Sequence, residues 1–283
     1  MDSQLEGFIR IPVAEGSFQT LPVDQAKRLA DSEINIELAE EKDAYRIAEG
    51  LYTCFPESWW NKKEPLHLRP ATNEIRVQRL AKRLQPSFSQ PGMHWIKAVH
   101  VPTSTIIGAA GWAGPTLPIH NVFRRSAMTF YGWQEKLGWS DSDIDELFAH
   151  TDEQAWSGNF AKDDDTRRGI LKGEPHWYLA PLITWPEWQG RGVGKKLLSW
   201  ATEQADAQDP PTPMYLESAP TARAVYMHVG FEPQGDVNFV RRGPRVVRGL
   251  EAGKEGKGGK MEEKVEEVDV ETVAKEMEAN MAP

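Results

Sequence analysis

A short glycine-rich segment holds the residues of this chain that are best suited to chemistry. Its members are Gln189, Gly190, Arg191, Gly192, Val193, Gly194 and Lys195. Alternating glycines let consecutive backbone N–H groups turn toward one concave surface, and the positive end of a following helix adds to the effect. Such a surface binds phosphate oxygens. We therefore interpret the segment as a pyrophosphate-binding loop.

Spacing separates this loop from two better-known glycine loops. A dinucleotide fingerprint needs glycine where Lys195 stands, and a P-loop needs glycine at Gln189 and a hydroxyl residue at Lys196. The remaining pattern, Q-x-x-G-x-G, lies between an apolar strand at 179–185 and an amphipathic helix at 195–206. It resembles the acetyl-coenzyme A loop of the GCN5-related N-acetyltransferases, the GNAT superfamily. The alternative is a glycine-rich turn that only tightens the connection.

A second segment resembles the same family. Residues 213–218 predict a buried strand, and residues 221–229 predict a short helix that ends at Gly230. The string A-x-x-x-Y-x-x-x-G-F at 222–231 is similar to the GNAT element whose tyrosine protonates the departing thiolate. By this resemblance, Tyr226 is the expected general acid.

The resemblance implies a fold and a cosubstrate. It implies an α/β (α+β) fold with a central, mostly antiparallel mixed sheet that is flanked by helices. A break in the apolar pattern adds a helical insertion before the cofactor strand. Acetyl-CoA is the expected cosubstrate, with no metal. The diphosphate would lie on the backbone of Gly190–Lys195, and the pantetheine arm would run beside the strand residues Leu182, Ile183 and Thr184.

The base that deprotonates the acceptor amine is less clearly marked. Glu217 is the favoured candidate, with His176, Glu174 and a water relay as alternatives. Each side chain also has a structural interpretation: a tied buried carboxylate, a packed histidine and a solvated loop residue. Trp59 and Trp60 would line the acceptor pocket or, more ordinarily, plug the core.

The apolar pattern divides the chain into segments. Strands are expected at 34–38, 94–101, 105–112 and 237–242, and helices at 41–55, 73–84 and 142–156. The predicted domains are an irregular lead-in at 1–32, a GNAT acetyltransferase domain at 33–248 and a charged disordered tail at 249–283. Within the domain, residues 113–175 form an insertion that would act as a substrate lid.

Composition excludes several classes of protein. The chain has 283 residues, 40% of them hydrophobic, and a single cysteine, Cys54, so it has no intrachain disulfide. Net charge is -9, which gives no electrostatic reason to expect nucleic acid as a partner. The first residues lack a signal-peptide pattern and no segment is long and apolar enough for a membrane span. We expect a cytoplasmic enzyme; the sequence does not indicate its oligomeric state.

These observations predict an N-acetyltransferase. It would move an acetyl group from acetyl-CoA to an amine of a small molecule by direct attack in a ternary complex. The insertion holds eleven acids against seven basic residues, which favours a cationic acceptor. Alternatives are acetylation of a protein lysine or N-terminus, and a non-catalytic CoA-binding module, which is motivated by the unclear base and by Ala219 where the family often has asparagine. A nucleotide-binding regulator lacks the lysine–hydroxyl pair.

Overall fold

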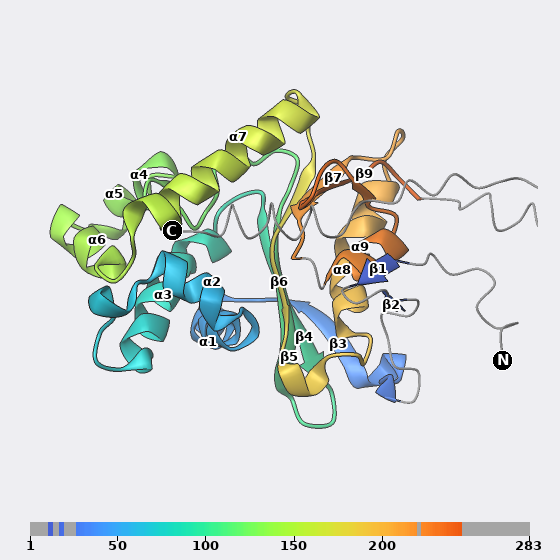
Figure 1. Cartoon of the computed structure of the whole chain (residues 1–283), viewed down its shortest axis with the longest axis horizontal. Helices are drawn as coiled ribbons and strands as arrows, with labels where there is room; N and C mark the ends of the chain where they lie inside the picture. The colour runs from blue at the N-terminus through green and yellow to red at the C-terminus, as the bar shows by residue number, and fades with distance from the viewer. Residues whose placement is uncertain (1–10, 14–16, 20–26, 220–221, 245–283) are drawn as a thin grey trace, which may run out of the picture. The chain divides into compact units, whose positions relative to one another are not determined.

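The structure, a computed structural model, describes residues 11–13, 17–19, 27–219 and 222–244. Its central element is a mixed sheet of seven strands (Figure 1). The strands are β3 (Ile34–Leu38), β4 (Met93–His100), β5 (Thr105–Ala113), β6 (Trp177–Thr184), β7 (Met214–Glu217), β8 (Glu232–Pro233) and β9 (Asn238–Arg241). They lie in the order β3-β4-β5-β6-β7-β9-β8. Every neighbouring pair is antiparallel except β6 and β7, which are parallel. The predicted fold class is confirmed.

Helices cover both faces of this sheet (Figure 1). One face carries α1 (Ala44–Cys54), α2 (Glu57–Lys63), α3 (Asn73–Phe88), α4 (Ala127–Phe130), α5 (Trp133–Leu137), α6 (Asp141–Phe148), the π-helical turn η7 (Gln154–Gly158) and α7 (Asn159–Leu171). The other face carries α8 (Val193–Asp206) and α9 (Arg223–His228). Short 3-10 turns are η4 (Asp31–Glu33), η5 (Glu41–Asp43), η6 (Leu66–Leu68) and η8 (Pro186–Trp188).

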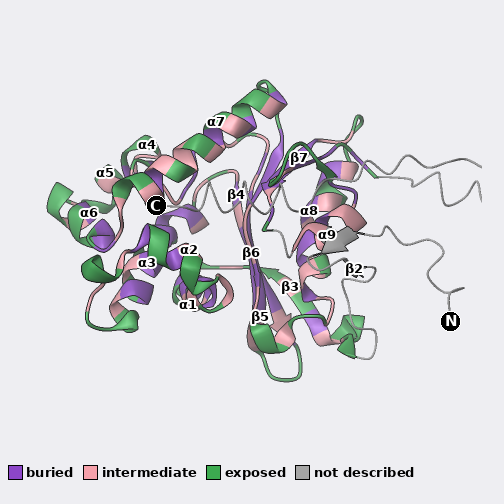
Figure 2. Cartoon of the chain, viewed as in Figure 1, coloured by how far each residue is buried: buried purple, intermediate pink, exposed green. Residues whose placement is uncertain are grey.

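Two apolar layers hold the helices on the sheet, and the central strands are buried between them (Figure 2). On the α8 side, the helix buries Leu197 and Leu198 completely. On the α1 side, contact is so close that a Cβ on Gly50 would lie 2.5 Å from the Trp185 ring and 2.7 Å from Ile183 Cδ1. Glycine is therefore required where α1 crosses the end of β6.

A bulge in β6 opens the sheet between β6 and β7. Ala110 of β5 pairs with Leu182 of β6, and Trp112 of β5 pairs with Leu179 of β6. A step of two residues on β5 therefore matches a step of three on β6, so β6 has one extra residue. A bulged strand bends and twists locally, and the segment includes Pro181, which cannot donate a ladder hydrogen bond. Along the described chain, β7 pairs with β6 only at Trp177–Leu179. Beyond the bulge, one edge of β6 is not paired with a strand.

The sequence located most of these elements. The strand at 34–38 has the predicted bounds, and the helix at 73–84 extends to Phe88. The predicted helix 142–156 is wrong as one element. Asp152 Oδ1 accepts a hydrogen bond from the Ala155 amide (2.7 Å), so a second helical segment starts there after α6 has ended. The strand predicted at 237–242 is present as β9, and it lies inside the sheet because β8 pairs along its outer side.

The ends of the chain lie mostly outside this description. Within the predicted irregular lead-in at 1–32, β1 (Ile11–Val13) and β2 (Ser17–Gln19) form a two-stranded antiparallel hairpin. The predicted tail at 249–283 and the boundary near Arg248 lie outside the described residues. No helix of the described segments is both long and apolar enough to cross a bilayer.

Candidate active site

The predicted phosphate loop connects β6 to the N-terminus of α8. Gly190 and Gly192 have φ values of +71° and +92°, a left-handed conformation that glycine adopts without strain. Gly192 is also the N-cap of α8, and it has no side chain to bond the first-turn amides. The N–H groups that open α8 are therefore left for an external acceptor, and the helix dipole favours an anion there.

The loop is fastened to the end of β6. Gln189 Nε2 donates to the Thr184 carbonyl at 2.9 Å. A Cβ on Gly194 would lie 3.7 Å from Leu182 Cδ2 and 3.9 Å from Thr184 Oγ1. The first turn of α8 thus lies over the last residues of β6. The Gln189 side chain closes the loop onto the strand.

Hydrogen-bond direction along β6 can be read from its register. The Trp185 amide donates to the Ile107 carbonyl at 3.1 Å, which places Ile183 in the bonded series with β5. Main-chain groups of Leu182 and Thr184 then point away from β5, toward the edge that β7 has left. Ile183 instead contributes its main chain to the ladder and a buried side chain to the α1 layer. Leu182 and Thr184 are thus the predicted strand residues whose amides face the opening.

Glu217 ends β7 next to this opening, on the α7 face of the sheet. The residue keeps some surface, yet its Oε1 is buried and has no hydrogen-bond partner within the described chain. Burial raises the pKa of the Glu217 carboxyl to about 8, and the charge of Asp163 acts in the same direction. Arg167 and the hydroxyls of Tyr178 and Tyr215 partly oppose this rise in pKa. Near neutral pH the carboxyl therefore exchanges a proton readily.

A buried polar network on α7 and the segment before α4 reaches Tyr178, on the strand beside this carboxyl, and the sequence did not reveal it. Asp164 on α7 accepts hydrogen bonds from the Asn121 amide (2.9 Å), Arg124 Nη1 (3.0 Å) and Arg167 Nη2 (3.2 Å). The Arg167 guanidinium lies 3.8 Å from the centre of the Tyr178 ring. The spacing of Asp164 and Arg167, three residues apart on one helix, indicates such an ion pair in the sequence, but the same spacing is also common on solvent-exposed helix faces.

A small cavity lies where β6 leaves β7. It has a volume of about 10 Å³, and its lining includes Leu117, Asn121, Arg167, Tyr178 and Ala180. This volume holds about one water molecule. Residues 117–122 and Arg167 of α7 therefore pack closely over this part of β6.

Tyr226 lies on the other face of the sheet. Its side chain is only 7% exposed and packs in the α8 layer, with the Phe231 ring 6.0 Å away in an edge-on contact. Gly230, at φ +93°, ends the helical turn, and the Phe231 amide donates to the Tyr226 carbonyl at 3.1 Å. Burial raises the pKa of the Tyr226 phenol, which therefore stays protonated at neutral pH.

The other sequence candidates are occupied by structural contacts. His176 Nδ1 lies 2.7 Å from the Glu174 carbonyl, at the start of β6 and far along the strand from the loop. The Glu174 carboxylate forms an ion pair with Arg242 at 2.8 Å. Trp60 is 2% exposed and stacks on Tyr52 at 4.0 Å. These contacts favour packing and surface roles for these residues.

Comparison with known proteins identifies the domain. Residues 141–248 match the family model described as "Acetyltransferase (GNAT) domain". No curated protein matches the chain. Within the described residues, no group of three or more His, Cys, Asp or Glu is placed to hold a metal ion.

Solved structures are similar at low identity. One, described as histone acetyltransferase HPA2 and related acetyltransferase from Corynebacterium glutamicum, is 17% identical with a TM-score of 0.46, covering 76% of this chain and 98% of its own. The PaiA N-acetyltransferase of Thermoplasma acidophilum, solved with coenzyme A, is 13% identical with a TM-score of 0.39, covering 74% and 98%. A mosquito arylalkylamine N-acetyltransferase-like protein is 13% identical with a TM-score of 0.43, covering 71% and 84%. Such similarities assign no substrate to this chain.

Proposed function

We propose that this chain, whose residues 141–248 match the GNAT acetyltransferase domain, transfers an acetyl group from acetyl-CoA to an amine of a small molecule. One observation carries the proposal: the edge of β6 that β7 leaves unpaired is followed, after η8 and the glycine loop, by the uncapped N-terminus of α8. A ligand with an amide-bearing arm and a diphosphate matches that combination. The arm adds to the open edge like a strand, and the diphosphate takes the helix amides.

Bound acetyl-CoA would supply an activated acyl group, and the residues of the chain would position and polarise it. The amides of Gly192, Val193 and Gly194 hold the diphosphate, while Arg191 and Lys195 add positive charge. The outward N–H groups of Leu182 and Thr184 bond the arm and donate toward the thioester oxygen, where negative charge develops. We place no metal in this reaction.

The two faces of the sheet then have separate tasks. Glu217, on the α7 face, accepts a proton from the acceptor amine, which must be neutral to attack. Tyr226, on the α8 face, donates a proton to the departing sulfur. Attack through the opening from one face and departure on the other support direct transfer in a ternary complex rather than an acyl-enzyme. An acyl-enzyme would need a nucleophilic side chain. Burial raises the pKa of the single cysteine, Cys54, to about 12, which keeps its thiol protonated and a poor nucleophile.

We further propose that the insertion at 113–175 is a lid that encloses a small amine. Leu171 of α7 packs with Tyr178 and Tyr215, so the lid contacts the strands on both sides of the opening. This favours a small-molecule acceptor over a protein lysine or N-terminus.

Thiol release from acetyl-CoA with a panel of small amines and lysine peptides tests this function. We expect turnover with at least one small amine and none with peptides. Turnover with peptides alone would contradict the choice of acceptor. Binding of acetyl-CoA without thiol release across the whole panel would indicate the non-catalytic module.

Replacing Tyr226 by phenylalanine is expected to lower kcat by about 100-fold while the Kd for acetyl-CoA changes less than about twofold, because only a proton donor is removed. Steady-state kinetics and calorimetry check the two values. Tyr45→Phe is the control, since Tyr45 is an exposed tyrosine of α1 whose hydroxyl bonds Glu74. An unchanged kcat in Tyr226→Phe would remove this residue from the mechanism.

A further inference from the structure

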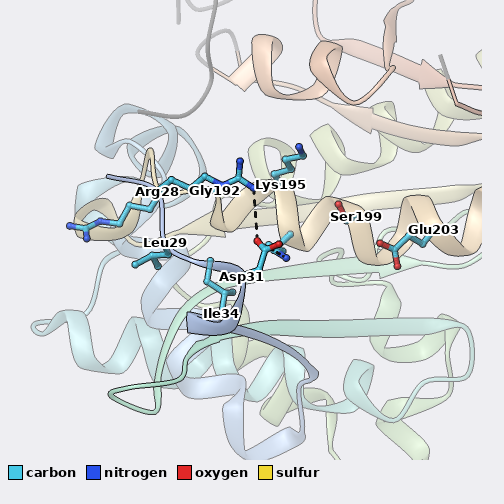
Figure 3. Close-up of a pocket in the computed structure, with 10 residues that line it drawn as sticks. Arg28, Leu29, Asp31, Ile34, Gly192, Lys195, Ser199 and Glu203 are labelled. Carbon is cyan, nitrogen blue, oxygen red and sulfur yellow. Dashed lines mark ion pairs between the residues drawn. The ribbon is translucent and has the colours of Figure 1, made fainter. Parts of the chain in front are cut away.

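A second, larger hollow lies beside the phosphate loop, between the first turns of α8 and the segment that precedes β3 (Figure 3). Its volume is about 230 Å³. Its ionic lining consists of Arg28, Asp31, Arg191, Lys195, Lys196 and Glu203. Four cations therefore face two carboxylates, and the hollow has a net positive charge.

The N-terminal segment is held against the loop by a main-chain bond. The Leu29 amide donates to the Arg191 carbonyl at 3.2 Å. The Arg28 side chain crosses Gly192, with Cγ 3.8 Å and Nε 3.9 Å from where a Cβ on that glycine would be. Arg28 thus brings a cation to the loop from a segment outside the matched family region.

The carboxylates of the hollow are already engaged or displaced from the loop. Asp31 lies 3.0 Å from Lys196 Nζ and 3.9 Å from Arg28 Nη2, and the hydrogen bond and charge of Lys196 lower its pKa. Glu203 lies more than two turns along α8 from Lys195. Asp31 lies closer to Lys196 than to Arg28, so the Arg28 guanidinium is able to take an added anion beside Arg191 and Lys195 of the loop. Guanidinium groups match phosphate oxygens in paired hydrogen bonds.

We propose that this hollow binds a phosphate monoester, namely the 3′-phosphate of coenzyme A, and that Arg28 is the residue that recognises it. The inference rests on the proposed function. Coenzyme A carries this monoester on the ribose that follows its diphosphate, so the two anions are a few bonds apart. The hollow shares Arg191, Gly192 and Lys195 with the diphosphate loop, which places both anion sites within reach of one ligand. A monoester carries nearly two negative charges at neutral pH, which suits the positive excess.

Calorimetric titration of the full chain with coenzyme A and with dephospho-coenzyme A, which lacks the 3′-phosphate, tests the proposal. We expect wild type to bind coenzyme A about tenfold or more tightly than the dephospho form, the size of one or more charge-assisted hydrogen bonds. In Arg28→Ala this ratio should fall to about threefold or less, with the Kd for the dephospho form unchanged. Arg28→Lys keeps the charge without the planar fork and should give an intermediate ratio.

A matched control is Arg168→Ala. Arg168 pairs with Asp165 three residues before it on α7, as Arg28 pairs with Asp31 three residues after it. It should leave the ratio at the wild-type value. Equal wild-type affinities for the two ligands, or an unchanged ratio in Arg28→Ala, would overturn the 3′-phosphate assignment while coenzyme A binding stands. If inorganic phosphate bound to the hollow in that case, the ligand of the hollow would be a free phosphate. Failure of wild type to bind either ligand would instead overturn the proposed function.

Discussion

Gly192→Asp is expected to weaken coenzyme A binding by at least 100-fold, about 2.7 kcal/mol. The substitution forces a side chain onto a residue at φ +92° and places a carboxylate at the opening of α8, where the account puts the diphosphate. Calorimetry with coenzyme A measures the loss. Gly192→Ala, which adds strain without charge, should give a smaller loss.

The control for backbone strain is Gly138→Asp. Gly138 has φ +65° at the C-cap of α5, with no atom within 4 Å of an added Cβ. It therefore shares the left-handed conformation of Gly192 but not its place in the loop. Full coenzyme A affinity in a folded Gly192→Asp variant would remove the loop from the binding site.

Glu217→Gln is expected to lower kcat by about 100- to 10,000-fold, the range typical of a lost general base. In wild type, the pKa of about 8 means that the reactive carboxylate becomes more populated as pH rises to that value. The rate should therefore increase with pH up to about 8 and then level off. In Glu217→Gln, this rise should be absent. Glu174→Gln is the control, since Glu174 is the exposed alternative base and pairs with Arg242.

The stability of the protein gives a second measure of the same carboxyl. Between about pH 4.5, the ordinary pKa of a glutamate, and pH 8, the Glu217 carboxyl keeps its proton in the folded state and loses it in the unfolded chain. The folded state thus binds more protons in this window, and the free energy of unfolding falls as pH rises through it. Glu217→Gln should remove that slope. A wild-type rate that is flat from pH 6 to 9, with the slope in stability present, would show a buried carboxyl without a role in catalysis.

The parts of the site that were predictable from the sequence are local in the chain. The loop and its helix depend on the spacing of Gln189 and the glycines, and the helix end after Tyr226 depends on Gly230. Both are short-range patterns that backbone geometry enforces. The structure accordingly places a left-handed N-cap at Gly192 and a left-handed end at Gly230.

The parts that were missed depend on tertiary placement. The bulge near Pro181 shows only when the partners of β6 are known, because one extra residue changes which side chains face each side. The Asp164–Arg167 network needs α7 to pack on Tyr178, and on its own the helix looks like a solvated one. Arg28 belongs to a segment without periodicity, and a single main-chain bond from Leu29 brings it to the loop.

Residue-resolved amide hydrogen exchange, with and without saturating acetyl-CoA, tests the central claim most directly. The open edge of β6 and the start of α8 are predicted to receive the ligand through their main chain. Exchange should slow at Leu182, Thr184 and the amides of 192–195, while Ile183, already bonded within the β5 ladder, should change little. Unchanged exchange at all of these amides with saturating ligand present would contradict the account.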